Sequence, residues 1–469
     1  MTTQPLSENE TIKKKNINPI IILLGILILA SALTYFVDSG SYQRDGKLVV
    51  AGSYEVLEKD TSLLNIFNTT SDEGAHRAEP VSIIGTLLSI PEGLQRGSGL
   101  IFMVLLIGGM FGILTSTGAI DAGLERLLSA VNGNMYILVP SLMIVFSAGS
   151  TFLGLASEYL LIIPIIVAMA NRLGLSNVIG LAIVTVGTKV GYLASVTNPL
   201  PLTIAQPLVG LQIFSGADVR FLFYLVFLTV GILFMLFTVK AAGYDKNVEV
   251  HFEDKKLSKN HIILLLSLVV GVGFLVYASN RWQWTHEALS AYYIGLSIFL
   301  AGLSNLGVSE AAEAFVSGMK KVLMASILIG VATAVTVVLQ EGQILDTIVH
   351  GLMGLIGNGS QYLAAIGMFI SQLFLDFLIP STSGQAAVSM PIMGPIGQLA
   401  GVQPQTTVLA FLFGNGLTNM LTPTSGTLLA YLATAQVGWG EWAKFIFPLW
   451  ILFAIISMVL LSFAVAFNF

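Results

Sequence analysis

Long apolar runs separated by short polar segments cover most of the chain. The apolar core of a bilayer is about 30 Å thick, so a straight spanning helix needs about 20 apolar residues. Seven runs have about this length and each predicts one transmembrane helix: 18–37, 98–118, 219–240, 260–279, 288–305, 323–340 and 445–467. The first run continues to Val37, which predicts an uncleaved anchor rather than a signal peptide.

Two longer runs predict helical hairpins that enter the membrane and return on the same side. The run 135–171 is interrupted by small and polar residues at Ser147–Thr151, and the run 361–400 is interrupted at Pro380–Gly384. Each run is too long for one straight span. We therefore expect two helical arms in each, with the interruption at the tip of the hairpin.

Two further long runs predict broken transmembrane helices. The run 176–210 is interrupted at Ser195–Pro199, and the run 405–437 is interrupted at Thr418–Gly426. Unwound backbone is tolerated inside a membrane only where it lines a polar cavity or is covered by protein. Both interruptions are therefore candidates for a binding site.

Lysine clusters give the orientation of these elements. By the positive-inside rule, the tail with lysines 13–15, the loop 240–259 and lysines 320 and 321 face the cytoplasm. With this orientation, the order span, span, hairpin, broken helix, span occurs twice in opposite directions. The sequence thus predicts an all-α polytopic membrane protein with two inverted-topology repeats, each containing a re-entrant helical hairpin and a broken transmembrane helix.

The predicted organisation follows from this count. A cytoplasmic tail, 1–17, precedes the first repeat, 18–240, which includes an outside loop at 38–97 ending in an amphipathic helix near 81–94. The segment 241–287 holds a cytoplasmic loop, a linker helix and a short outside loop, and the second repeat covers 288–469. The N-terminus is expected in the cytoplasm and the C-terminus outside. A channel or scaffold with incidental helix breaks is the alternative.

Composition excludes several classes of protein. The chain is 55% hydrophobic and 10% charged, which is too apolar for a soluble globule of 469 residues. Lys and Arg total 21 against 26 Asp and Glu, so no basic face is available for nucleic acid. The sequence has no ATP-binding loop and no hydrolase motif, so we expect a gradient-driven protein and no enzyme.

The four interruptions supply the candidate site residues. Helix N-termini suit a carboxylate, whereas freed carbonyls and hydroxyls suit Na⁺. The predicted substrate-binding residues are Ser150, Thr151, Glu158, Lys189, Ser195, Thr197, Asn198, Ser381, Thr382, Ser383, Thr418, Asn419, Thr422, Thr424 and Ser425. A possible Na⁺ site is assigned to Ser150, Asn198, Ser381 and Asn419, and no other cofactor is expected. The alternative for each polar residue is helix-to-helix hydrogen bonding.

Asn198 and Asn419 are predicted to form a pair, one from each half. Each lies at the interruption of a broken helix, beside a segment that contains proline. If the halves are related by symmetry, we expect the two side chains to play equivalent parts in the site.

Three charged residues lie deep inside predicted helices. Glu158 follows the first hairpin tip by seven residues, Asp376 precedes Ser381 by five, and Lys189 precedes Ser195 by six. Charged groups inside a span are costly and usually serve transport pathways. Glu158 and Asp376 are therefore candidate coupling acids. The alternative for Lys189 is a buried ion pair with one of them. No histidine lies in mid-span, so a histidine proton relay is not expected.

These interruptions resemble those of the C4-dicarboxylate anaerobic carrier family of the ion transporter superfamily. The likeness covers nearly the whole chain and is carried by Gly149-Ser150-Thr151, Val196–Pro199, Pro380–Gly384 and Thr418–Gly426. Sodium-coupled relatives carry Ser-Asn-Thr at both hairpin tips, whereas this chain has Gly-Ser-Thr and Ser-Thr-Ser. The resemblance implies a homodimer in which a scaffold domain holds a mobile transport domain that moves like an elevator.

The predicted function is secondary active transport of a small carboxylate-bearing metabolite, of the C4-dicarboxylate type, across the cytoplasmic (inner) membrane. Coupling to Na⁺, to H⁺ or to exchange remains open. Because two of the three deep charges are acids, an amine-bearing amino acid is the alternative substrate. The family resemblance extends to amino acids, including arginine/ornithine exchange. An ion channel is the lesser alternative.

Overall fold

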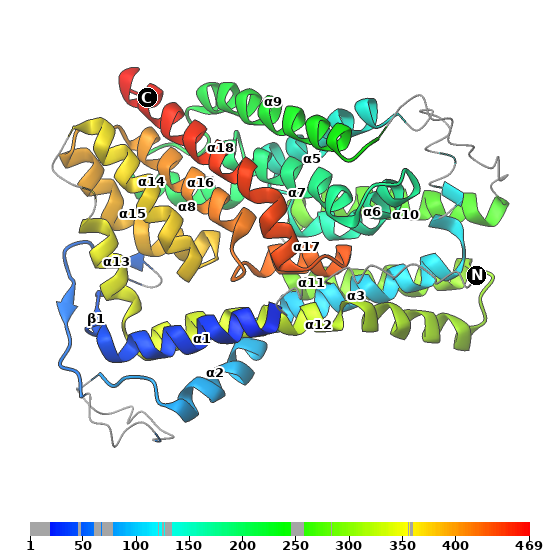
Figure 1. Cartoon of the computed structure of the whole chain (residues 1–469), viewed down its shortest axis with the longest axis horizontal. Coiled ribbons are helices and arrows are strands. Elements are labelled where there is room, and N and C mark those ends of the chain that lie inside the picture. Colours follow the sequence, from blue (N-terminus) through cyan, green and yellow to red (C-terminus); the bar gives the residue numbers. More distant parts are fainter. Residues whose placement is uncertain are drawn as a thin grey trace, which may run out of the picture.

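The computed structural model is almost entirely helical (Figure 1). It describes residues 19–45, 48–60, 67, 78–120, 122–123, 126, 134–244, 258–282, 284–354, 356 and 360–469. The predicted tail 1–17 lies outside these residues. Seven of the described helical segments are long and apolar enough to cross a membrane, which confirms a polytopic, all-α membrane protein.

The helices of the first half are α1 (Pro19–Phe36), α2 (Ile83–Arg96), α3 (Ser98–Ser116), α5 (Met135–Leu153), the 3₁₀ helix η2 (Ser157–Leu161), α6 (Ile163–Arg172), α7 (Asn177–Ala194), α8 (Pro199–Leu208) and α9 (Ala217–Ala241). The rest are α10 (Lys259–Trp282), α11 (His286–Leu303), α12 (Val308–Glu341), α13 (Leu345–Gly354), α14 (Gln361–Leu378), α15 (Thr382–Leu399), α16 (Pro404–Leu421), α17 (Gly426–Ala435) and α18 (Trp439–Ala466). Every predicted span falls on one of these helices, but α12 begins well before the predicted span 323–340 and includes Lys320 and Lys321, which were expected to lie outside the helix.

The described residues between α1 and α2 include four two-residue strands. The strand β1 (Gly40–Ser41) pairs antiparallel with β4 (Glu55–Val56), and β2 (Arg44–Asp45) pairs antiparallel with β3 (Leu48–Val49). This segment is fastened to α13, because the Arg44 guanidinium donates to both carboxylate oxygens of Asp346 at 2.7 and 2.9 Å.

The first hairpin turns later than predicted. Helix α5 continues through Ser147–Thr151 and ends at Leu153, where Gly154 adopts a left-handed conformation with φ of 75°. The small residues predicted to form the tip instead allow close packing, since a Cβ on Gly191 of α7 would lie 2.3 Å from the Ser147 carbonyl oxygen. Small residues commonly serve this purpose between membrane helices. The predicted tip is therefore wrong by several residues.

The other three interruptions overlap the predicted segments, but two are shorter than predicted, since Thr382–Gly384 already belong to α15 and Thr418–Leu421 still belong to α16. The second hairpin breaks between Leu378 and Thr382, and the Ser381 hydroxyl caps the start of α15 by accepting from the Gly384 amide. The first broken helix is interrupted at residues 195–198 and the second at 422–425. In each case a polar residue caps the arm that follows.

The packing repeats between the two halves. Helix α5 packs on α7 and both contact α9, just as α14 packs on α16 and both contact α18. The second arms of the broken helices cross over, since α8 packs on α15 and α17 packs on α6. These recurring pairs agree with two repeats. Their opposite orientation across the membrane stays a prediction.

Two long helical stretches form the opposite side of the molecule (Figure 1). The stretch made of α2 and α3 lies along α12, which also contacts α1. Contact is close because glycines face each other: a Cβ on Gly112 would lie 2.1 Å from the Ala314 carbonyl oxygen, and one on Gly93 would lie 2.4 Å from that of Gly330. The amphipathic helix predicted near 81–94 is α2, and one of its faces packs on α12.

Candidate functional site

A cavity of about 560 Å³ lies between the two hairpin tips. Its walls are the first tip at Leu153–Glu158, the start of α8 at Pro199 and Leu200, the segment Trp284–Glu287 with Leu289, and Ser383 of the second hairpin. These segments are far apart in the sequence. The cavity therefore brings both hairpins and the first broken helix to one place.

Glu158 lies on the first tip and not within a hairpin arm. Because α5 ends later than predicted, this residue falls in η2, where its carboxylate is half-buried and accepts from the Ala156 amide at 3.0 Å. The Ala156 carbonyl in turn accepts from the Tyr431 hydroxyl of α17 at 2.6 Å. The tip is thus held by its own carboxylate on one side and by the second broken helix on the other.

Asn198 and Ser383 place two helix starts at the cavity. The Asn198 Oδ1 accepts from the Leu200 amide at 3.0 Å and so caps α8. Its Nδ2 is buried and has no hydrogen-bond partner in the described part of the chain. Ser383 lies exposed in the first turn of α15. Amide groups at a helix start carry partial positive charge and favour anionic groups. This applies to α15 but not to α8, because Pro199 and Pro201 have no N–H and the Leu200 amide is bound by Asn198.

The third wall brings charged residues that the sequence analysis did not select. His286 and Glu287 open α11 and line the cavity, and Glu158 acts electrostatically on His286 across it. Sequence reasoning treated this segment as a short outside loop. The feature of the sequence that could have indicated a site here is the pair His286 and Glu287, which lies directly between two predicted spans.

A buried polar network lies beneath the second tip. Asp376 of α14 is fully buried, and its Oδ1 accepts from Asn415 Nδ2 at 2.6 Å and from Asn419 Nδ2 at 2.8 Å. Its Oδ2 is buried without a hydrogen-bond partner among the described residues. A carboxylate so placed needs a compensating charge or proton, since a lone buried charge is strongly disfavoured.

Tyr192 joins this network to the cavity. Its hydroxyl donates to Asn415 Oδ1 and lies 2.9 Å from the hydroxyl of Thr382, the neighbour of Ser383. Helices α7, α15 and α16 thus meet at one cluster of hydrogen bonds. Asn415 and Tyr192 were not predicted from the sequence, because each lies inside a helix before its interruption.

Lys189 lies on α7 one turn before Tyr192 and is buried, with 8% of its surface exposed. It acts electrostatically on Asp376, although no carboxylate oxygen of the described residues lies within 4.0 Å of its Nζ. The alternative of a buried ion pair is therefore not found as a direct contact among the described residues, and Asp376 is the acid of the two that acts on Lys189.

Arg220 of α9 binds the first interruption. Its side chain is fully buried and donates to the carbonyl oxygens of Ser195 at 3.2 Å and Val196 at 3.1 Å. The same interruption is fastened to the first hairpin, because the Thr151 hydroxyl accepts from the Val196 amide at 3.0 Å and the Thr197 amide donates to the Thr151 carbonyl. Arg220 was not among the predicted site residues, because it lies just inside a predicted span.

Several predicted site residues have protein partners in this structure. Thr418 donates to the Leu373 carbonyl at 2.8 Å, and Thr424 donates to the Phe377 carbonyl at 2.8 Å. Thr422 is hydrogen-bonded to Thr424, Ser195 donates to the Tyr192 carbonyl, and Thr197 donates to the Phe152 carbonyl. The bonds of Thr418, Thr424 and Thr197 to other elements are the helix-to-helix contacts that were the alternative expectation, whereas those of Ser195 and Thr422 are local.

Asn198 and Asn419 do not occupy equivalent positions, so the predicted pairing is wrong in this respect. Asn198 caps the second arm of its broken helix, and the residue with that role in the other half is Ser425. Asn419 lies within the last turn of α16.

The predicted Na⁺ site consists of Ser150, Asn198, Ser381 and Asn419. No hydrogen bond between described residues joins any two of these four residues.

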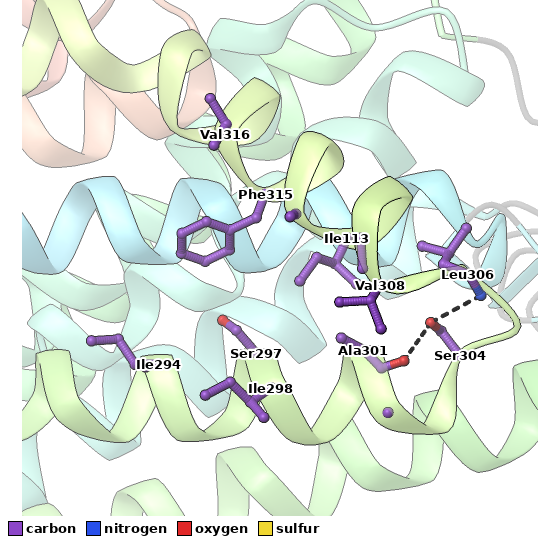
Figure 2. Close-up of a pocket in the computed structure, with 13 residues that line it drawn as sticks. Ile113, Ile294, Ser297, Ile298, Ala301, Ser304, Leu306, Val308, Phe315 and Val316 are labelled. Atoms are coloured by element: carbon purple, nitrogen blue, oxygen red, sulfur yellow. Dashed lines mark hydrogen bonds between the residues drawn. The ribbon is translucent and has the colours of Figure 1, made fainter.

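A second cavity, of about 660 Å³, lies between α3, α11 and α12 (Figure 2). Its lining is apolar apart from Ser297 and Ser304, whose hydroxyls donate to carbonyls of their own helix. It offers no charged group to a metabolite, so the cavity between the tips is the candidate site.

Interrupted membrane helices that meet at a polar cavity are typical of membrane transporters. The comparisons agree, and the chain belongs to the C4-dicarboxylate anaerobic carrier (DcuC) family, whose model matches residues 18–466. It is 29% identical to the "Putative basic amino acid antiporter YfcC" of Escherichia coli (strain K12), over 91% of each chain. It is 25% identical to an "Uncharacterized protein" of Haemophilus influenzae (strain ATCC 51907 / DSM 11121 / KW20 / Rd), over 93% of this chain and 95% of that one.

Among solved structures, the YdaH transporter of Alcanivorax borkumensis aligns over 96% of this chain and 99% of its own, with a TM-score of 0.42 and 13% identity. The MtrF efflux pump of Neisseria gonorrhoeae aligns over 96% of each chain, with a TM-score of 0.41 and 18% identity.

Proposed function

We propose that this membrane transporter exchanges small cationic amino acids, such as arginine and ornithine, across the cytoplasmic membrane. The observation that carries the proposal is the charge of the cavity between the tips. Among the described residues that line it, the charged or titratable side chains are Glu158, Glu287 and His286, and there is no lysine or arginine. A cationic substrate group would therefore find acidic partners there.

The two ends of such a substrate have distinct places in the cavity. The side-chain cation would lie at Glu158, with Glu287 on the facing wall. The α-carboxylate would lie at the start of α15, near Ser383. Amide groups at a helix start favour a carboxylate. The name of the Escherichia coli relative agrees with this class of substrate.

A C4-dicarboxylate is the second candidate. The family to which the chain belongs supports it, and Lys189 supplies a basic group near the second tip. Lys189 does not line the cavity, however, and Asp376 lies close enough to act on it electrostatically. The charge of the cavity therefore favours the amino acid.

For the transport movement, we propose that the hairpins and broken helices move together against α1, α2, α3, α11 and α12 within a homodimer, like an elevator. The close glycine contacts between α3 and α12 suit a rigid support. The N-terminus would lie in the cytoplasm and the C-terminus outside.

Counterflow in proteoliposomes tests the substrate. Vesicles loaded with unlabelled arginine should take up labelled arginine, with saturation and with competition by ornithine and lysine but not by succinate or fumarate. Glu158→Gln should lower this exchange by about tenfold or more, equal to about 1.4 kcal/mol. The matched control is Glu310→Gln, an exposed carboxylate on α12 outside the cavity, which should leave exchange unchanged.

Two outcomes would contradict the proposal. Competition by dicarboxylates alone would favour the second candidate. Conduction of ions without counterflow would indicate a pore and not a carrier.

A further inference from the structure

Interrupted helices expose backbone carbonyls and acids where a carrier can hold a coupling cation. In this chain, one such place is already bound by a basic side chain. The Arg220 guanidinium donates to the Ser195 and Val196 carbonyls of the first interruption at 3.2 and 3.1 Å. A positive charge of the protein itself thus binds the oxygens that a metal cation would use.

The second half has the same requirement at Asp376. Its Oδ1 accepts from two asparagine amides, which are neutral donors, and its Oδ2 has no hydrogen-bond partner among the described residues. The carboxylate is fully buried between α14 and α16. Neutral donors alone do not compensate a buried negative charge, so the carboxylate needs either a proton or a positive charge nearby.

Lys189 is the basic residue that acts on this carboxylate. It projects from α7, which packs on α16 and carries Tyr192, one of the links in the Asp376 network. No carboxylate oxygen of the described residues, including those of Asp376, lies within 4.0 Å of its Nζ, so any interaction between the two charges acts without a direct salt bridge. Lys189 and Asp376 are thus buried groups of opposite charge on helices that meet at the Tyr192–Asn415 hydrogen bond.

We propose that Lys189 is a built-in counter-ion that takes the place of a coupling cation at Asp376. The network then carries no net charge whether or not substrate is present, and the carrier needs no Na⁺ to neutralise it. The charge that changes during the cycle is that of Glu158, which a cationic substrate compensates. An empty carrier would move an uncompensated carboxylate, which is unfavourable in a dry environment, so exchange is favoured over net transport. This last step rests on the proposed function, whereas the counter-ion role does not.

Thermal unfolding of the purified full-length protein in detergent tests the counter-ion role without any substrate. The samples are the wild type, Lys189→Met, Asp376→Asn and the double variant, each in NaCl or choline chloride at equal ionic strength. The wild-type melting temperature should be the same in both salts. Lys189→Met should melt lower in choline chloride and recover in NaCl or at lower pH, because Na⁺ or a proton then compensates Asp376. The double variant should recover most of the loss in either salt.

Three results would overturn the inference. They are a wild-type protein stabilised by Na⁺, a Lys189→Met protein that melts like wild type in choline chloride, and a double variant no more stable than Lys189→Met. If Lys189→Met cannot be purified, recovery of folded protein by the double variant supports the pairing, and its absence contradicts it.

Arginine counterflow then tests the consequence for transport. Wild-type exchange should agree within about twofold between NaCl and choline chloride, whereas Lys189→Met should lose about tenfold in choline chloride only. If the wild type does not exchange arginine at all, the proposed function fails, while the melting temperatures still decide the role of Lys189.

Discussion

The two broken helices share one plan, but their freed carbonyls are satisfied by different chemistry. In the first half, the charged Arg220 donates to the carbonyls of Ser195 and Val196. In the second half, three neutral indoles of α18 donate to the last carbonyls of α16: Trp439 to Leu421 at 2.8 Å, Trp442 to Met420 at 2.9 Å, and Trp450 to Leu417 at 2.9 Å. Both solutions satisfy groups that hydrocarbon cannot.

The hairpin arms that face these interruptions also differ in charge, but here the charged residue lies in the second half and the neutral one in the first. Thr151 and Asp376 both lie two residues before the end of a first hairpin arm. The neutral Thr151 faces the half that contains Arg220, whereas the charged Asp376 faces the half that contains the indoles. Each half thus holds buried charge of one sign, and Lys189 of α7 compensates Asp376 of α14 across the boundary. The buried positive and negative charges therefore compensate each other over the whole molecule and not within each repeat.

The largest expected contrast is in orientation. Ser176 and Gln403 are exposed residues that precede α7 and α16 at equivalent positions. Because the repeats are predicted to be inverted, Ser176→Cys should label only from the cytoplasm and Gln403→Cys only from outside. The chain contains no cysteine, so labelling with a membrane-impermeant maleimide has no background. Labelling of both from one side would show that the repeats are parallel.

The next largest effect is expected at Arg220. Replacing it with Met leaves two buried carbonyls of the first interruption without donors, which should lower the free energy of unfolding by about 2–5 kcal/mol. Denaturant titration of the purified protein would measure the loss. Arg281→Met, an exposed arginine at the end of α10, is the control and should change stability by less than about 0.5 kcal/mol. An equal effect of both substitutions would mean that the first interruption does not depend on the guanidinium.

The smallest effect is expected at the second interruption. Trp442→Phe keeps the buried ring but removes one of three indole donors, so it should cost about 1 kcal/mol by the same titration. Transport activity should remain. A loss as large as that for Arg220→Met would show that one neutral indole matters as much as the guanidinium, and the contrast between the halves would disappear.

Much of the fold could be predicted from the sequence because membrane helices must be long and apolar. Three of the four interruptions could also be placed, since proline, asparagine and serine mark where a helix cannot continue or where it is capped. The fourth was misplaced because glycine and serine at 147–151 have two uses. They can end a helix or allow another helix to approach, and the choice depends on Gly191, a residue of a different helix.

The candidate site was only partly predictable. Glu158 and Asp376 stood out as charges inside apolar runs, yet one lies at a tip and the other is buried among asparagines. Arg220, Asn415 and the pair His286 and Glu287 were not selected. Their importance comes from groups that approach them from other helices, and sequence spacing does not report such distances.

The sequence by itself determined that the chain spans a membrane many times, with helices interrupted at polar segments, because hydrocarbon requires apolar side chains and satisfied backbone groups over a fixed length. Only the tertiary structure decided which charges face one another. Electrostatic compensation depends on distances across α7, α14 and α16, and so the pairing of Lys189 with Asp376 and the acidic cavity at Glu158 and Glu287 required the packed helices.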